Sequence, residues 1–435
     1  MKVKQFKGIT LIALVITIIV LLILAGVTIY MLTGDNGILK QATNARETND
    51  KSEFEEQIKL AVMASRVNDT SSINVEILDE ELNKISGIAT TKSAENRLPW
   101  TVKKESYELT INVDGTITRN TVIEQATAAK PKGSTIDPTT NKDTGIVMID
   151  TNGSEWVWVE VPITVFKTAT SSTDYENIKA DLIAYASDYR DKNYADGWYS
   201  GCGLTQGEYT TKYQAMLSSI YTNKGFYIGR YEAGIDGSDT NISLARKSRT
   251  EITSSSPKAV SRKDMIPYNY VRCSDAQQLA NGMATGNKTS SLMFGIQWDL
   301  VCKFLEVKGN WDTTTNTAQY YINENSTSWG NYGNSIFTID STNAKKYSAW
   351  KSISGQKTQS ALLTTGATEY TNKMNIYDFA GNEYEWTLEK SPVPDRFPCT
   401  RRGGSYALTS VPAFYRNYIR TTYADYDNGF RASLY

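Results

Sequence analysis

The sequence predicts an α+β protein in which a long N-terminal helix precedes a small αβ region and a large, loop-rich C-terminal domain. Three observations predict it. An apolar run from Ile9 to Leu32 follows several lysines. Apolar and polar residues alternate at the strand period from Tyr107 to Val113, and a hairpin turn follows at Asp114–Gly115. Glycine-rich blocks crowd the C-terminal part, and the 435 residues are enough for more than one domain.

Residues 9–67 form the predicted long helix, and its first part is apolar enough to cross a membrane. At ~1.5 Å per residue, Ile9 to Leu32 spans a bilayer core of about 30 Å. Lys2, Lys4 and Lys7 precede the run, and this distribution predicts an N-terminus on the cytoplasmic side. We therefore expect a single-pass cell-membrane protein whose C-terminal domain is extracellular.

The first residues, with Lys7–Gly8–Ile9–Thr10 before the apolar run, resemble the leader of the type IV pilin class. The resemblance implies cleavage by a prepilin peptidase between Gly8 and Ile9, which removes residues 1–8. It also implies other pilin subunits as partners. The fifth residue after the cut is Ala13, where the class has a Glu that seats the subunit in the filament. Filament assembly and a plain signal anchor both stay open.

Residues 68–135 are expected to form a small αβ region. The exposed half of the long helix carries Phe54, Ile58, Ala61 and Val62 at helical spacing, so it should pack on this region. A helix and the hairpin at Asp114–Gly115 together resemble a minimal pilin headgroup. Residues 136–144 are polar and rich in turn formers, and we expect them to be a linker.

The predicted C-terminal domain, residues 145–435, carries three blocks: Asn375–Trp386, Arg401–Tyr406 and Gly429–Arg431. In this order they resemble the closing motifs of the formylglycine-generating, or sulfatase-modifying-factor, domain family. The resemblance implies a C-type-lectin-like fold with many loops. Residues 168–207 diverge from the family, so they are expected to be an insertion. The motif residues expected to build the scaffold are Gly381, Asn382, Glu385, Trp386, Arg402, Gly403, Gly404, Ser405, Gly429, Phe430 and Arg431.

The residues between these blocks argue against catalysis. Family members that oxidise sulfatase cysteines use a copper-binding Cys pair, and the matching positions fall near Leu408 and Ala413, which cannot bind a metal. The chain has no histidine, which excludes the iron chemistry of a related branch. A net charge of −1 does not indicate the excess of basic residues that is typical of nucleic-acid-binding proteins. We expect no catalytic residue.

The sequence leaves cofactors and disulfides open. No cofactor is expected, although some family members bind structural calcium, and Asp378, Asn382 and Glu385 could join such a site. Buried free thiols are the simplest interpretation of the four cysteines, but one or two disulfides would also suit an extracellular domain. The four cysteines are Cys202, Cys273, Cys302 and Cys399.

The tail between Gly404 and Gly429 is rich in Tyr and Asn. It resembles the variable region of diversity-generating retroelement targets, in which scattered positions on a C-type-lectin-like face are diversified. An ordinary tyrosine-rich loop surface is the alternative, and either would make a binding surface. The residues expected to bind ligand are Tyr406, Leu408, Phe414, Tyr415, Asn417, Tyr418, Ile419, Tyr423, Asp425, Tyr426, Asp427 and Asn428.

Together these features predict a surface-displayed, pilin-like, membrane-anchored binding protein. Its C-terminal domain should recognise an external protein or glycan. Two alternatives remain at this stage: an oxidase of the formylglycine-generating type, and a structural minor pilin or pseudopilin that carries this domain as a bulky tip.

Overall fold

The computed structural model describes residues 53–66, 72–93, 95–104, 107–120, 130–409 and 411–435. The chain divides into two compact units, Met1–Glu124 and Gln125–Tyr435. The expected leader cleavage between Gly8 and Ile9 and the expected membrane span both lie outside the described residues. Within the described ranges, no helix is long and apolar enough to cross a membrane.

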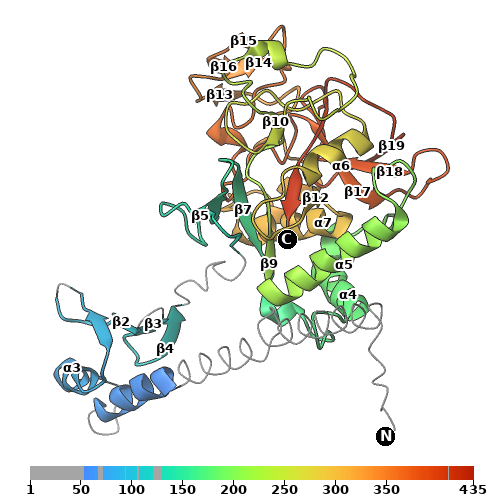
Figure 1. Ribbon diagram of the computed structural model, residues 1–435. Helices are drawn as coiled ribbons and strands as arrows, with labels where there is room; N and C mark the ends of the chain where they lie inside the picture. Colours follow the sequence, from blue (N-terminus) through green and yellow to red (C-terminus); the bar gives the residue numbers. More distant parts are fainter. Residues whose placement is uncertain (1–52, 67–71, 94, 105–106, 121–129, 410) are drawn as a thin grey trace, which may run out of the picture. The chain divides into compact units, whose positions relative to one another are not determined.

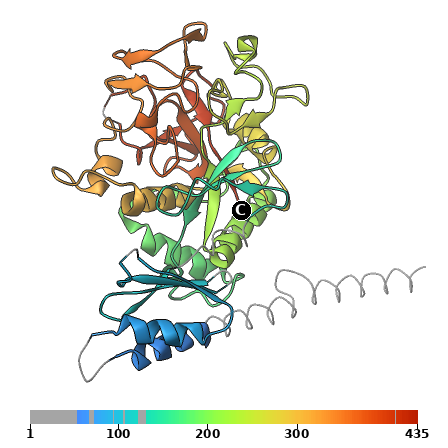
Figure 2. The same ribbon diagram turned by 90° about the vertical axis from the view of Figure 1, so that its left-hand side faces the viewer.

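The N-terminal unit packs two helices on one face of an antiparallel four-stranded sheet (Figure 2). Residues 53–64 are helical, and Phe54 and Ile58 from this segment lie in the core with Leu78 and Trp100. The strands follow one another in the order β1-β2-β3-β4. The other elements are α3 (Val75–Asn83), β1 (Ile88–Thr91), β2 (Trp100–Lys104), β3 (Tyr107–Ile111) and β4 (Ile117–Asn120).

Local sequence signals account for the ends of these elements. Asn74 begins α3 because its side-chain oxygen accepts hydrogen bonds from the backbone N–H groups of Glu76 and Ile77. The predicted hairpin is present: β3 and β4 pair with Ile111 opposite Ile117. Gly115 has a φ of 77° in the turn between them, a conformation that glycine adopts without steric cost. Whether this unit is a pilin headgroup stays a prediction.

The expected linker at 136–144 is wrong, because this segment belongs to a sheet of the C-terminal unit. β5 (Thr135–Ile136) pairs antiparallel with β6 (Val147–Ile149), and the residues between them form the connecting turns. Thr140 is buried there, and its hydroxyl accepts a hydrogen bond from the Val147 N–H at 3.0 Å. Hairpin turns and linkers share a polar, Pro- and Asn-rich composition, so composition alone did not separate them.

The C-terminal unit is built around two sheets (Figure 1). The first has the strand order β12-β21-β9-β7-β6-β5, so β21 lies inside the sheet between β12 and β9. In the second, β19-β18-β17-β20, only β20 runs parallel to its neighbour, and β8 also pairs with β17. Their remaining strands are β7 (Glu155–Glu160), β8 (Ala195–Asp196), β9 (Gly225–Gly229), β12 (Ser290–Leu292), β17 (Tyr384–Lys390), β18 (Cys399–Arg402), β19 (Arg416–Ile419), β20 (Asn428–Phe430) and β21 (Ala432–Leu434).

Helices and short hairpins complete this unit. The helices are α4 (Tyr175–Tyr185), α5 (Gln206–Asn223), α6 (Cys273–Asn281), α7 (Gly295–Lys308) and α8 (Ala318–Asn323), with short 3-10 turns η1 (Ile163–Val165), η2 (Ser187–Tyr189), η3 (Ile242–Leu244) and η4 (Glu369–Thr371). The small hairpins pair β10 (Gly234–Ile235) with β11 (Ala259–Val260), β13 (Phe337–Ile339) with β16 (Gly355–Lys357), and β14 (Lys345–Lys346) with β15 (Lys351–Ser352).

One aromatic-rich core connects most of these elements. Trp298 of α7 and Trp386 of β17 are fully buried in it, and the Trp298 ring stacks on Phe379 with centroids 4.2 Å apart. Residues 168–207, expected as a divergent insertion, supply core side chains such as Ile178 and Tyr189. This segment is therefore part of the domain's packing. The assignment to a C-type-lectin-like fold stays a prediction.

Candidate binding face

The predicted scaffold residues are all buried, and their polar side chains bond to other side chains or to the backbone. Glu385 and Arg431 form a buried pair in which Arg431 Nη2 lies 2.8 Å from Glu385 Oε1. Arg431 also donates to the backbone oxygens of Gly229 and Tyr377 at 2.8 Å. The Trp386 indole donates to the Val271 oxygen at 2.9 Å. These bonds join the second sheet to β9 and to the loops around it.

Asn382 lies at the centre of the loops that precede β17. Its amide donates to Glu232 Oε2 at 2.6 Å and to the Leu363 oxygen, while its Oδ1 accepts from Asn331 Nδ2 at 2.8 Å. Gly381 next to it has a φ of 77°, and a Cβ there would collide with the backbone of Asn331. The Gly-Asn motif is therefore explained by backbone packing.

Glu232, Asp378, Glu383, Glu385 and Arg431 form an acid-rich cluster of four buried carboxyl groups and one arginine. Neither carboxyl oxygen of Glu383 has a hydrogen-bond partner among the described residues. Burial raises the pKa of Glu383 well above its usual value, and neighbouring carboxylates raise it further. Burial also raises the pKa of Glu385 to about 7, although Arg431 beside it acts in the opposite direction.

The three candidate calcium ligands already have protein partners. Asp378 accepts hydrogen bonds from the Gly366 N–H at 2.7 Å and the Thr371 hydroxyl at 2.8 Å. Asn382 and Glu385 are occupied by the contacts just described. Among the described residues, no group of three His, Cys, Asp or Glu side chains could hold a metal ion. The oxygens of these three side chains are therefore engaged by groups of the protein.

A second buried cluster lies under β18 and β19 and is called here the arginine-rich cluster. Arg402 bonds to Glu389 Oε2 at 2.8 Å and to Asp299 Oδ1 at 3.0 Å. Arg416 bonds to the other oxygen of Glu389 at 2.9 Å and to Asp299 at 2.7 Å. The members of the cluster are Arg190, Arg402, Arg416, Asp196, Asp299 and Glu389.

The cluster balances three positive with three negative side chains. Arg190 forms ion pairs with Asp299 at 3.0 Å and with Asp196 at 3.1 Å. Asp196 also accepts a hydrogen bond from the Ile296 N–H at the start of α7. Burial alone would raise the pKa of Glu389, but the arginines around it lower it to about 2. The cluster thus fixes β18, β19 and α7 as one rigid base.

Above this base, two of the expected ligand-binding residues are exposed, one just before β19 and one within it. Tyr415 and Tyr418 are 37% and 46% exposed, while Arg416 between them is buried in the arginine-rich cluster. Asn417 is half-buried and accepts a hydrogen bond from Arg401 Nε at 3.1 Å. Ile419 and Phe414 are half-buried and pack against the core. In this segment the buried Arg416 therefore faces the base, while Tyr415 and Tyr418 reach the surface.

Tyr406 and Tyr426 lie in a group with two further tyrosines, Tyr270 and Tyr347, which the sequence did not indicate as part of the binding face. The rings of Tyr406 and Tyr426 lie 6.1 Å apart, and Tyr426 stacks on Tyr347 at 6.3 Å. The Tyr347 hydroxyl lies 3.2 Å from that of Tyr270. Tyr270 and Tyr347 come from loops far from the tail, and no local sequence signal distinguished them from other loop tyrosines. Tyr426 is 37% exposed.

The remaining expected residues differ in accessibility. Tyr423, Asp425 and Asp427 are half-buried, and the Tyr423 hydroxyl donates to Asp425 Oδ2 at 2.8 Å. Asn428 was expected at the surface, and this expectation is wrong: it is fully buried in β20 and its Oδ1 accepts from Arg401 Nη1 at 3.1 Å. Its position opposite Tyr384 in the parallel pair of β17 and β20 explains the burial.

The two positions that match the family's copper-binding cysteines have structural surroundings. Leu408 is half-buried, and its backbone oxygen accepts from the Gly333 N–H at 2.7 Å. Ala413 is buried, and its N–H donates to the Ser326 hydroxyl at 2.8 Å. Neither side chain offers a metal ligand.

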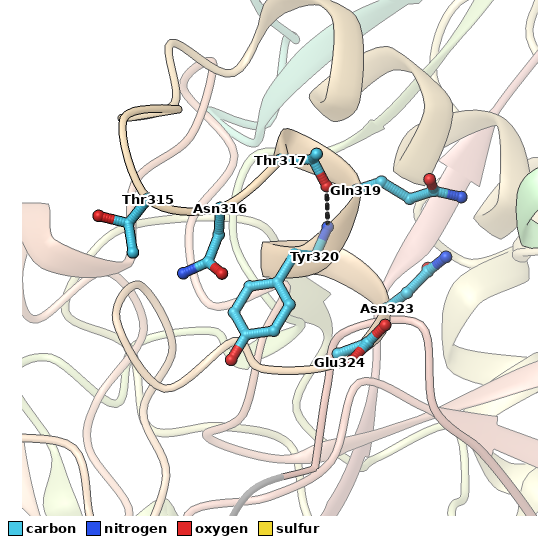
Figure 3. A pocket seen from close by; sticks show the side chains of 7 residues that line it. All are labelled: Thr315, Asn316, Thr317, Gln319, Tyr320, Asn323 and Glu324. Atoms are coloured by element: carbon cyan, nitrogen blue, oxygen red, sulfur yellow. Dashed lines mark hydrogen bonds between the residues drawn. The ribbon is translucent and has the colours of Figure 1, made fainter.

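A shallow hollow lies elsewhere, at the start of α8 (Figure 3). It is lined by polar side chains, and the Thr317 hydroxyl in its rim accepts from the Tyr320 N–H at 3.1 Å. None of the expected ligand-binding residues lines it. The lining residues are Thr315, Asn316, Thr317, Gln319, Tyr320, Asn323 and Glu324.

No protein-family model and no curated protein matches the sequence. Among solved structures, the chain is similar to Treponema denticola variable protein 1, with 14% sequence identity over 69% of this chain and 98% of that chain, and with a TM-score of 0.20. A similarity this weak carries no argument about fold or function, so the proposals below rest on the residues themselves.

Proposed function

We propose that the chain is a surface-displayed binding protein whose C-terminal domain recognises an external protein or glycan. Its binding face consists of the residues expected from the tail, without Asn428, together with Tyr270 and Tyr347. Exposed tyrosines supply contact area at a low cost in side-chain entropy, which suits them to recognition. A pilin-like leader and membrane anchor would present the domain outside the cell.

The contrast between the buried Arg416 and the exposed Tyr415 and Tyr418 supports this proposal most. Arg416 is held on the inside by two carboxylates, and Tyr415 and Tyr418 stand outside. A buried arginine paired on both sides keeps its strand in one register, so the outer side chains can differ without loss of the fold. A face of this kind tolerates variation, which is the property that diversification by a retroelement requires.

DNA sequencing tests the diversification part of the proposal. We expect a near-copy of the segment encoding Tyr406–Asn428 near the gene, with adenines at the differing positions. Among isolates, substitutions should concentrate at Tyr415, Tyr418 and Tyr426 and should spare Arg416 and Asn428. If both the repeat and a reverse transcriptase are absent, diversification is wrong, whereas binding is unaffected.

A binding measurement tests the face directly. The full chain would be applied to arrays of glycans and of cell-surface proteins, beside a variant with Tyr415, Tyr418 and Tyr426 each changed to Ala. Val307→Ala is the matched control, because Val307 is 60% exposed on α7 and outside the face. The triple variant should lose the array signal and the control should keep it. Copper uptake with turnover of a Cys-containing sulfatase peptide would instead favour the oxidase.

A further inference from the structure

The hairpin that joins β17 to β18 places an aromatic ring beside the exposed tyrosine of β19. Residues 391–398 make this connection, and the rings of Phe397 and Tyr418 lie 5.8 Å apart. Val393 of the hairpin is 42% exposed, and Tyr418 is 46% exposed. The hairpin precedes β18, so it lies outside the tail from which the binding face was expected. Exposed apolar surface therefore continues from the tail onto a second element.

Two arginines flank the Phe397 ring. The guanidinium carbon of Arg396 lies 4.9 Å from the ring centroid, and that of Arg420 lies 5.9 Å from it. Both arginines are exposed, and among the described residues neither guanidinium group forms an ion pair or a hydrogen bond. With Lys390 and Asp395 counted, the region has an excess of two positive charges. The basic edge is the name used here for Val393, Arg396, Phe397, Tyr418 and Arg420.

Prolines and hydrogen bonds fix the shape of the hairpin. Three prolines within residues 391–398 restrict its backbone. The Phe397 N–H donates to the Val393 oxygen at 2.9 Å, and the Ser391 hydroxyl donates to the Phe397 oxygen. A segment that is already held in one shape loses little conformational entropy when it binds. The hairpin therefore presents its side chains in a binding-ready arrangement.

The strand beside the basic edge has one free side. β19 is the last strand of the second sheet, and among the described strands it pairs with β18 alone. No backbone hydrogen bond from another described segment reaches residues 416–419. An outer strand of this kind accepts an extended peptide chain through its backbone groups. Arginine, tyrosine and phenylalanine are also enriched where proteins contact one another. Both features favour a protein partner over a glycan.

We propose that the basic edge binds an acidic segment of a protein partner, which lies along β19 with its carboxylates on Arg396 and Arg420. This inference rests on the proposed function, because it names the chemistry that the binding face recognises. Guanidinium groups bind carboxylates through paired hydrogen bonds, and the rings of Phe397 and Tyr418 supply apolar contact. Arg396 and Phe397 precede the tail, so diversification of the tail would leave these two contacts unchanged.

Binding to defined peptides tests the proposal. The full chain would be applied to immobilised peptides of alternating glutamate and serine, to the same peptides with glutamine in place of glutamate, and to heparin. We expect binding to the glutamate peptides alone. In the double variant Arg396→Gln with Arg420→Gln, the affinity should fall about tenfold, because two charge-assisted contacts are lost. Unchanged affinity of this variant would overturn the proposal, as would preferential binding of heparin or no binding to any of the three.

Two further variants separate charge from folding. Arg97→Gln with Lys132→Gln is the matched control, since it removes the same charge from two exposed sites that are not part of the face. It should bind the glutamate peptides as the wild type does. The charge-reversed variant Arg396→Glu with Arg420→Glu should instead bind peptides of alternating lysine and serine. A charge-reversed variant that still prefers the glutamate peptides would contradict the placement of the carboxylates.

The arrays described for the proposed function distinguish the two failures. The arginine variants would be measured there beside the variant that lacks the three tyrosines. If the tyrosine variant loses the array signal and the arginine variants keep it, the binding face stands and the basic edge is wrong. If the tyrosine variant keeps the signal, the proposed function itself is wrong.

Discussion

The two buried charge clusters of the C-terminal unit use similar side chains in different proportions. In the arginine-rich cluster, each carboxylate faces arginine donors; the pKa of Glu389 falls to about 2, whereas burial raises the pKa of Asp196 and of Asp299 in spite of the arginines. In the acid-rich cluster, four carboxyl groups share Arg431, and burial keeps the pKa of Glu383 well above its usual value. The pKa of a buried carboxyl group therefore depends on the balance between burial and its partners, and only at Glu389, among these carboxyl groups, do the arginines outweigh burial.

The pKa shifts of Glu389 and Glu383 have opposite signs, so the pH dependence of the unfolding free energy can distinguish them. Glu389, with a lowered pKa, contributes stability that is present above its unfolded pKa and is lost as pH falls from about 4.5 toward 2. Glu383, with a raised pKa, contributes stability that is present below its unfolded pKa and is lost as pH rises above about 4.5. Glu389 and Glu383 should therefore limit stability from opposite sides of the pH range.

The largest effect is expected for Glu389→Gln. Arg402 and Arg416 would then face one negative charge fewer in a buried site, and breaking such a pairing costs about 3–5 kcal/mol. Urea unfolding of the full chain at pH 7 measures the loss. The exposed Glu324→Gln should change the unfolding free energy by less than about 0.5 kcal/mol. Equal unfolding free energies of the two variants would show that the arginine-rich cluster does not stabilise the fold.

Arg431→Met is expected to be next in size and to depend on pH. At pH 8 it leaves Glu385 ionised without a partner, at a cost on the order of 3 kcal/mol. At pH 5 Glu385 can take up a proton, because burial already raises its pKa to about 7 beside the arginine. Unfolding measured at both pH values should show a smaller loss at pH 5. A loss independent of pH would mean that Glu385 does not titrate.

Glu383→Gln should act in the opposite direction. Glutamine resembles the protonated acid, so the variant keeps its stability at pH 8. The unfolding free energy of the wild type falls by on the order of 1.4 kcal/mol for each pH unit between the unfolded and the folded pKa of Glu383. The advantage should disappear near pH 4.5. Unfolding free energies of both proteins from pH 4.5 to pH 8 would measure this. A variant less stable than the wild type at pH 8 would mean that Glu383 is ionised and has a partner.

The smallest effect on stability is expected outside the clusters, on β19. Tyr418→Ala removes a side chain that is 46% exposed, so the unfolding free energy should change by less than about 0.5 kcal/mol. Arg416→Met, two residues earlier in the same strand, should cost several times more because it opens the arginine-rich cluster. Thermal unfolding of both variants makes the comparison. A large loss with Tyr418→Ala would assign that residue to the fold.

Sequence reasoning placed the buried motif residues and the exposed tyrosines of the tail more readily than it placed contacts between loops. Gly381 and Asn382 could be assigned to the scaffold because glycine and asparagine suit tight, hydrogen-bonded backbone. The arginine-rich cluster could not be predicted, since Arg190 and Asp196 come from a segment that looked like an insertion. Packing between distant loops leaves no periodic trace in the sequence.

The same limit explains two other misses. Asn428 shares the composition of the exposed tail but faces inward, because the parallel pairing of β17 and β20 was not visible in the sequence. Tyr347 joins the tyrosines of the tail only through tertiary packing. The membrane anchor, the leader and the filament stay predictions, because the residues that carry them lie outside the described ranges.

The position of β21 has a consequence for the order of events during synthesis. Ser433 pairs with both Ile228 and Ser291, so two strands made much earlier share a neighbour that leaves the ribosome long afterwards. Until then β9 has one bare hydrogen-bonding edge and β12 has no neighbour in this sheet, and such edges invite pairing with other chains. Closing contacts so distant along the chain is slow. Helper proteins that shield unfinished sheets should therefore matter most for this unit until β21 has been made.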